Sequence, residues 1–341
     1  MSLYINIKKR LHGFTLDIAL EIPKERFGLL GASGCGKSLT LACIAGFETP
    51  DSGIIVVDDN VFFDSSKKIN IPVQKRNVGL LFQNYALFPN MTVEENIAAA
   101  IFLPKNEKFK LISQQVKLFQ LEGLEKRYPY QLSGGQKQRV ALARMMAYNP
   151  EIIMFDEPFS ALDFHLKFQL EEQLMEVLEN TEAYVLFVSH NCEEVYKFCN
   201  KIGVIDGGRL EHLAPTHAIF SNPLTVSSAT LSGCKNISAI TKINDFTIDA
   251  IDWGVRLSTV KKVTDNINAV GIRPHMITPT DTIGENVFEY DNLRINTCIF
   301  SLLAIFNLNR QKKSLVCEMD KNIWHNHRYF KLPAKDLLLL E

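Results

Sequence analysis

The first chemistry that the residues offer is phosphate binding, in a glycine-rich segment near the amino terminus. Residues 31–38 match the pattern G-x-x-x-x-G-K-[ST] in full, between a short apolar run and a helical one. Glycines at these places let backbone N–H groups face phosphate oxygens, and the following helix adds the positive end of its dipole. We therefore predict a nucleoside triphosphate site, with Lys37 reaching the β- and γ-phosphates. The predicted residues are Gly31, Ala32, Ser33, Gly34, Cys35, Gly36, Lys37, Ser38 and Leu39.

A second segment supplies two carboxylates. Asp156 and Glu157 follow residues 152–155, an apolar run that predicts a buried strand. Asp156 and the Ser38 hydroxyl are the types of ligand that Mg²⁺ takes beside a nucleotide. Glu157 is expected to point elsewhere and to polarise an attacking water. Taken alone, the Asp-Glu pair is also compatible with an ordinary solvated strand end.

Further segments, in the expected order, resemble the ATP-binding-cassette (ABC) ATPases over about residues 1–225. Residues 132–136, Leu-Ser-Gly-Gly-Gln, resemble the signature of that family. The resemblance implies ATP and Mg²⁺ as cofactors and implies roles for single residues. Gln83 corresponds to the Q-loop glutamine, a magnesium ligand that joins the site to a membrane subunit, and His190 to the switch histidine that contacts the γ-phosphate. Asp163 belongs to the segment that matches the D-loop, and it is counted with the nucleotide-binding residues.

The same resemblance implies that the protein works in pairs. In the family, the signature closes over the nucleotide that a second cassette holds. Ser133, Gly135 and Gln136 are therefore expected to bind the ATP of a second copy or of a sister cassette. One family element is open: adenine usually stacks on an aromatic residue, for which Phe14 is the candidate, although Phe14 could equally be a strand core residue.

The apolar spacing predicts two domains. Residues 1–230 alternate strand and helix, which indicates an α/β fold with a mainly parallel sheet and a helical subdomain at about 84–150. Within that subdomain the clearest helical segments are 93–101 and 114–124, and Thr92 with Glu95 predicts a capped start for the first. Residues 231–341 are β-rich, with 295–308 among the extended segments, and predict a small β-barrel or sandwich. The family resemblance implies that this domain is regulatory and of the oligonucleotide-binding-like, molybdate-binding-like kind.

Composition and hydropathy limit the kinds of partner that the chain is expected to bind. With 37 basic and 38 acidic residues, the chain shows no bulk attraction to nucleic acid, and no nucleic-acid partner is expected. Its seven scattered cysteines favour reduced thiols in the cytosol. The longest apolar stretch falls short of the about 20 residues that a membrane helix needs. A transport role would therefore act from the cytoplasmic face of the membrane, through permease subunits and, indirectly, a substrate-binding protein.

Two classes of function compete within the resemblance. Soluble ABC ATPases of DNA repair or translation usually carry a coiled-coil insertion or two cassettes in one chain, and this sequence has neither. Residues 83–93 also resemble the segment that lines the permease groove of importer cassettes, although they could be plain subdomain core. We therefore expect the ATP-hydrolysing subunit of an ABC importer.

The cargo is read from the start of the second domain. Residues 232–237 resemble a stretch of small molybdate-binding domains, so Ser232, Lys235 and Asn236 are predicted to bind an oxyanion. Molybdate is the expected cargo, with tungstate or sulfate next, and sugar or ferric ion behind. The alternative is an ordinary turn that opens a strand, in a domain that only strengthens the dimer.

Overall fold

The computed structural model of the chain describes residues 1–82, 84–160, 164–311 and 313–341, and residues 164–166 only in their backbone. The described chain forms two compact units, Met1–Thr216 and His217–Glu341. The division precedes the expected boundary at residue 230, because the short helix α8 (Val226–Leu231) packs within the second unit. Its Ala229 shares an apolar cluster with Cys234, Ala269, Leu338 and Leu340.

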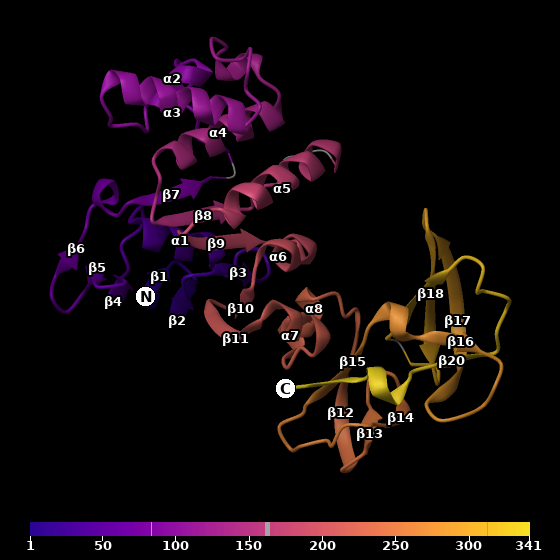
Figure 1. Ribbon diagram of the computed structural model, residues 1–341. Coiled ribbons are helices and arrows are strands. Elements are labelled where there is room, and N and C mark those ends of the chain that lie inside the picture. Colours follow the sequence, from indigo (N-terminus) through magenta and orange to yellow (C-terminus); the bar gives the residue numbers. More distant parts are fainter. Residues whose placement is uncertain (83, 161–163, 312) are drawn as a thin grey trace. The chain divides into compact units, whose positions relative to one another are not determined.

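An eleven-stranded sheet with the order β6-β5-β4-β1-β2-β11-β10-β3-β9-β8-β7 forms the frame of the first unit (Figure 1). Strands β10, β3, β9, β8 and β7 run parallel, as predicted. The strands are β1 (Ser2–Leu11), β2 (Phe14–Pro23), β3 (Arg26–Leu30), β4 (Ser52–Val57), β5 (Asn60–Asp64), β6 (Ile69–Asn70), β7 (Val78–Leu81), β8 (Ile152–Asp156), β9 (Tyr184–Ser189), β10 (Lys201–Asp206) and β11 (Arg209–Pro215).

Burial explains why the parallel strands read as continuous apolar runs. All six residues of β9 and the first four of β8 are buried, as expected for strands covered on both faces. Helix α1 (Lys37–Ala45) lies in one apolar core with both parts of the sheet. That core joins residues of α1, of the antiparallel strands and of the parallel strands, among them Leu41, Ile44, Ile5, Ile18, Met154 and Leu186.

A helical region lies at one end of the first unit (Figure 1) and comprises α2 (Val93–Ala98), α3 (Lys105–Leu118) and α4 (Gly134–Ala147). The predicted cap of α2 is confirmed, because the side chains of Thr92 and Glu95 each accept a hydrogen bond from the other's backbone N–H. Helix α3 begins earlier than the predicted residue 114. Its first turns are mostly exposed and show no apolar stripe, so periodicity could not find them.

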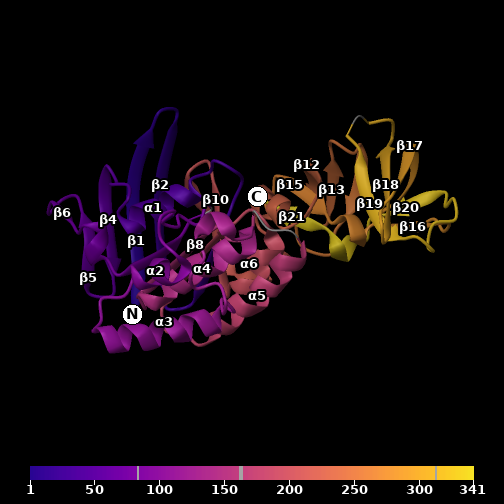
Figure 2. The ribbon, with the colours of Figure 1, turned by 90° about the horizontal axis from the view of Figure 1, so that it is seen from above.

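Two more helices cover the parallel strands. Helix α5 (Phe164–Glu179) buries Leu170, Leu174 and Leu178, which recur at every fourth position and so share one face of the helix. Helix α6 (Cys192–Phe198) lies beside it in both views (Figure 1 and Figure 2). Short 3₁₀ turns occupy Val73–Lys75, Pro129–Gln131, Pro274–Met276 and Ala334–Asp336. Within the described residues, no helix has both the length and the apolar character to span a membrane.

The second unit contains two five-stranded sheets over one apolar core, with the orders β14-β13-β12-β15-β21 and β16-β20-β17-β18-β19. Residues 295–308, predicted as one extended segment, form a hairpin whose turn is closed by Cys298 N–H and Ser301 O. Both tryptophans lie in this unit: Trp253 is fully buried and Trp324 is half-buried. Besides α7 (Thr216–Ser221), its elements are β12 (Asn236–Asn244), β13 (Thr247–Ala250), β14 (Val255–Ser258), β15 (Ala269–Ile272), β16 (Thr278–Thr280), β17 (Val287–Thr297), β18 (Ser301–Leu308), β19 (Leu315–Asp320), β20 (Tyr329–Lys331) and β21 (Leu338–Leu340).

Candidate nucleotide-binding site

The glycine-rich loop connects β3 to α1, which is the strand–loop–helix setting that the sequence pattern requires. Gly36 caps α1 with a φ of 108°, and a Cβ there would lie 2.6 Å from Cδ1 of Leu16. Gly34 has a φ of 79°, also in the left-handed region that favours glycine. These two positions therefore need glycine for the turn itself, independent of any ligand.

Lys37 is held across this loop. Its side chain is buried, and Nζ donates hydrogen bonds to the carbonyl oxygens of Gly31 at 2.7 Å and Ala32 at 2.9 Å. The ammonium group thus lies over the loop at the positive end of α1, where an anion is favoured.

A hydroxyl and a carboxylate meet beside the loop. Ser38 Oγ donates to Asp156 Oδ1 at 2.9 Å, which joins the first turn of α1 to the end of β8. Burial raises the pKa of Asp156 above the ordinary aspartate range, and the hydrogen bond from Ser38 acts in the opposite direction. Two hard oxygen ligands at the phosphate loop fit Mg²⁺. Among the described residues, no group of three or more His, Cys, Asp and Glu forms another candidate metal site.

Glu157 is turned away from Asp156 by an unusual backbone. Its φ is 50°, a region that non-glycine residues rarely occupy. The conformation is held because its N–H donates to Val188 O at 2.9 Å and its carbonyl accepts from Ser160 N–H at 3.2 Å. The carboxylate then lies 3.0 Å from Nδ1 of His190, directly after β9. Backbone strain of this kind is typical of functional sites.

The phosphate loop, the start of α1 and Glu157 line one cavity of about 410 Å³. Phe14 lines the cavity and also packs against the core, so neither of its two predicted roles is excluded. Leu11 and His12 line it as well, and we did not predict them; their place in the β1–β2 turn beside Phe14 was the available signal. The lining residues are Leu11, His12, Phe14, Ser33, Gly34, Gly36, Lys37, Ser38, Leu39 and Glu157.

The signature lies apart from this cavity. Ser133 is the N-cap of α4, where it and Gln136 exchange hydrogen bonds between side chain and backbone. Ser133 is exposed and Gly135 is buried, and neither belongs to the described lining of the cavity. The structure thus brings together Lys37, Ser38, Asp156, Glu157 and His190 and leaves the signature outside. Gln83 and Asp163 lie outside the described residues.

The predicted oxyanion site stays a prediction, and two of its three residues have other partners in the structure. Asn236 is buried; its Nδ2 donates to Ile272 O and Val316 O, and its Oδ1 accepts from Val316 N–H. Ser232 is also buried, and its Oγ donates to Ala229 O and accepts from Arg273. Their polar atoms are therefore used by the protein itself, while Lys235 is exposed. The ordinary turn that opens a strand is the better description.

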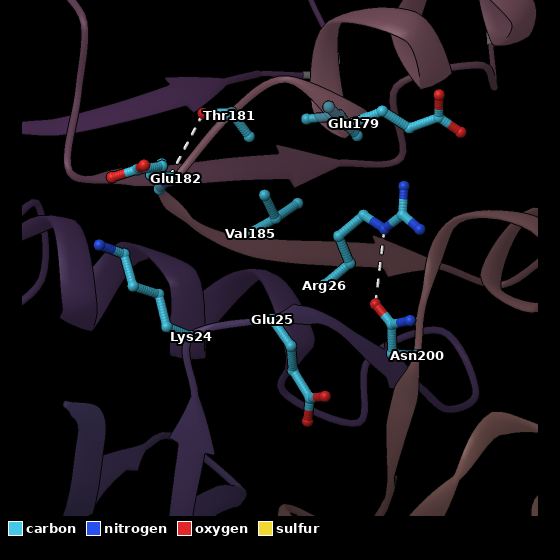
Figure 3. Close-up of a pocket in the computed structure, with 10 residues that line it drawn as sticks. Lys24, Glu25, Arg26, Glu179, Thr181, Glu182, Val185 and Asn200 are labelled. Atoms are coloured by element: carbon cyan, nitrogen blue, oxygen red, sulfur yellow. Dashed lines mark hydrogen bonds between the residues drawn. The ribbon is translucent and has the colours of Figure 1, made fainter.

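A second cavity, of about 580 Å³, lies at the amino ends of β3 and β9 (Figure 3). Lys24, Glu25, Arg26 and Glu182 point in different directions around it, and Arg26 Nε donates to Asn200 Oδ1 at 3.5 Å. Ligands of parallel sheets bind at the carboxyl ends of the strands, where the phosphate loop lies. We therefore assign the nucleotide to the smaller cavity.

The fold and this site define a phosphate-loop ATPase cassette, and comparisons with known proteins give the family. Residues 15–160 match the ABC transporter family. The sulfate/thiosulfate import ATP-binding protein CysA of Synechocystis sp. is 39% identical over 230 residues, which cover 65% of this chain and 63% of that protein. The Fe(3+) ions import ATP-binding protein FbpC of Haemophilus influenzae is 33% identical over 278 residues, which cover 80% of this chain and 77% of that protein.

A polyamine relative and a solved structure agree. The putrescine transport ATP-binding protein PotG of Escherichia coli is 39% identical over 225 residues, 65% of this chain and 58% of that protein. A dimeric structure of the ATP-binding cassette MJ0796 with ADP and Pi superposes with a TM-score of 0.55 at 28% identity, over 63% of this chain and 99% of that one. The chain belongs to the ABC transporter family, and ATP with Mg²⁺ is accordingly its ligand. The predicted resemblance, fold class and cofactors are confirmed.

Proposed function

We propose that this chain is the ATP-hydrolysing subunit of an ABC importer, with Glu157 as the general base. The observation that carries the proposal is the placement of the Glu157 carboxylate, beside the phosphate loop and 3.0 Å from His190. In this site Lys37 would hold the terminal phosphates, while Ser38 and Asp156 would hold Mg²⁺, which would neutralise phosphate charge when bound. Glu157 accepts a proton from the attacking water, and His190 contacts the γ-phosphate.

A second copy belongs to the proposed unit. The start of α4 presents an exposed Ser133 and the positive end of a helix dipole, which suits a phosphate. Since Ser133 lies apart from the cavity that contains Lys37, a nucleotide held by a partner chain is the proposed ligand. The dimeric cassette MJ0796 supports this arrangement.

A membrane partner is the third part of the proposal. An apolar groove of about 520 Å³ lies between the sheet and the helical region, and Phe47, Phe88 and Tyr148 help to line it. Arg144 of α4 donates to the carbonyl oxygens of Ala86 and Tyr85 and so fixes the turn at the edge of the groove. We propose that this groove receives a segment of a permease subunit. The protein would then act as a peripheral protein at the cytoplasmic face, coupled to a substrate-binding protein through the permease.

Purification from native membranes tests transport against the soluble alternatives. We expect the chain to be recovered with a hydrophobic membrane-spanning subunit, and Phe88→Asp to lose that subunit while hydrolysing ATP. Phe246→Asp, at another exposed aromatic residue outside the groove, is the matched control and should retain the subunit. Equal recovery with Phe88→Asp and wild type would contradict the groove as the docking site.

As cargo we propose a tetrahedral oxyanion, molybdate first and tungstate or sulfate next. The sulfate/thiosulfate relatives support the class, although the ferric-ion and putrescine relatives match at similar identity. Uptake of labelled molybdate, sulfate, ferric ion and putrescine by cells with and without the chain tests the order. If cells without the chain lost only ferric-ion or only putrescine uptake, that compound would be the cargo and the oxyanion proposal would be wrong.

For the second unit we propose a regulatory role. Since Ser232 and Asn236 are engaged by the protein, an oxyanion sensor would need other residues, such as the exposed Lys235. Calorimetry of the whole protein with molybdate, tungstate and sulfate, in wild type and Lys235→Ala, tests this. Absence of binding at millimolar oxyanion would favour the rival role, strengthening of the dimer.

A further inference from the structure

A partly buried ion pair joins the two helices that cover the parallel strands. Lys167 Nζ of α5 contacts Glu194 Oε1 of α6 and lies 3.8 Å from Glu171 Oε1. The Glu194 side chain is only 6% exposed, so its charge depends on these partners. The two helices lie side by side along this contact (Figure 1 and Figure 2).

Lys167 is an unusual residue at its place in the helix. It lies near the amino-terminal end of α5, where the helix dipole disfavours a cation. Glu171 and Glu194 compensate for that position. Besides its pair with Glu171 within α5, the lysine therefore contributes through its contact with α6.

The second oxygen of Glu194 continues the contact to the turn that carries His190. Ser189 Oγ donates to Glu194 Oε2 at 2.7 Å and accepts from Asn191 N–H at 2.9 Å. Asn191 in turn caps α6 through Glu193 N–H. Both neighbours of His190 are thus fixed, although its own side chain is 58% exposed.

We propose that Lys167 and Glu194 are positioning residues, which hold the His190 turn so that the imidazole meets Glu157 and the γ-phosphate. The inference rests on the proposed function of His190. Because α5 directly follows residues 161–163, in the segment that resembles the D-loop, the pair also ties the helix after that segment to the histidine. A change in the position of α5 would thus move the turn that carries His190.

The chain contains a matched control for helix packing. Lys197 joins the same two helices through Glu172 at 2.7 Å and Glu171 at 3.3 Å. Lys197 lies at the carboxyl end of α6, whereas Ser189 precedes the helix. The contacts of Lys197 therefore do not involve the His190 turn. If the ion pairs only fasten α5 to α6, Lys197→Met and Lys167→Met should behave alike.

The experiment measures Mg²⁺-dependent ATP hydrolysis and the melting temperature of the full chain. Variants are Lys167→Met, Glu194→Gln, their double variant, Ser189→Ala, Lys167→Arg and Lys197→Met. We expect the first four to lower kcat by about tenfold or more with little change in KM, the scale seen when a supporting partner of a catalytic group is lost. The double variant should lose no more than the worse single variant, because both act through one contact. Lys167→Arg keeps the charge and should restore most of kcat.

Lys197→Met should lower the melting temperature about as much as Lys167→Met, yet leave kcat within about twofold of wild type. A kcat that falls in Lys197→Met as in Lys167→Met, or that follows the melting temperature in all variants, would overturn the proposal. So would unchanged kcat in Glu194→Gln. Wild type and Glu157→Gln are measured beside them: a wild type without activity refutes the proposed function, whereas an active wild type with an unaffected Glu194→Gln refutes only this inference.

Discussion

The adjacent carboxylates of Asp156 and Glu157 contact different partners because their backbone conformations differ. Asp156 continues β8 and meets the Ser38 hydroxyl, while Glu157 bends into a left-handed conformation and meets His190. From the sequence alone, both residue types suit the roles proposed for them, a Mg²⁺ ligand and a general base. The backbone conformation decides which of them lies beside His190.

Replacing Glu157 by Gln should keep nucleotide binding and slow hydrolysis by roughly 100-fold or more, the scale expected for loss of a positioned general base. The amide keeps the shape of the side chain but accepts no proton. Steady-state hydrolysis and equilibrium ATP binding are measured together. A Glu157→Gln protein with the wild-type turnover rate would remove Glu157 from the mechanism.

A titratable pair in the second unit gives a prediction on pH. His327 Nδ1 lies 2.8 Å from Asp281 Oδ2, and its Nε2 lies 3.0 Å from Ile323 O. Since both partners are acceptors, the doubly protonated imidazolium is favoured, and the hydrogen bond with Asp281 raises the pKa of His327. The hydrogen bond from the backbone N–H of Arg328 lowers the pKa of Asp281, and the hydrogen bond with His327 lowers it further.

The sign follows from these directions. The raised pKa of His327 stabilises the fold below the ordinary histidine pKa of about 6.5, and this stability is lost as pH rises through the raised value. The lowered pKa of Asp281 stabilises the fold above its ordinary value of about 3.9 and is lost as pH falls through the lowered one. Asp281→Asn should return the pKa of His327 toward the ordinary value in an NMR titration, with His325 as the internal control. A His327 pKa that did not move would contradict the pairing.

At the scale of elements, the sequence predicted most of the first unit because its signals are local. An apolar run predicted β8, glycines predicted the loop before α1, and Thr92 with Glu95 predicted the start of α2. Long-range pairing was not predictable: Lys167 and Glu194 are 27 positions apart and match no motif. The hydrogen bond between Asn236 and Val316 could not be predicted for the same reason, since the two residues are 80 positions apart.

The exposed start of α4 gives a prediction on assembly. If Ser133 acts on a partner's nucleotide, Lys37→Ala and Ser133→Arg are each inactive, because every homodimer lacks one half of both sites. Random mixing makes half of the dimers mixed, each with one complete site, so about a quarter of wild-type hydrolysis should return. The mixture is compared with each variant alone. No recovery on mixing would contradict sites shared between copies.

At the scale of the whole molecule, the seven cysteines differ in burial: five are buried, Cys192 is half-buried and Cys298 is exposed. Burial raises the pKa of Cys43 and that of Cys317 to about 12, whereas Cys298 is exposed in the β17–β18 turn. The thiolate is the reactive form, so Cys298 should react first with a thiol reagent in the native protein. Mass spectrometry of partly labelled protein measures the order, and Cys298→Ser should lack the fast phase. Rapid labelling of Cys43 or Cys317 in folded protein would contradict their burial.

The placement of Trp253 and Trp324 has a practical consequence. Because both tryptophans lie in His217–Glu341, indole fluorescence arises from that unit alone. Trp253 is fully shielded from water, so its emission should shift to longer wavelength when this core opens. Unfolding of the second unit can thus be followed by fluorescence in the intact protein, without a label. Nucleotide hydrolysis would report separately on the integrity of the first unit.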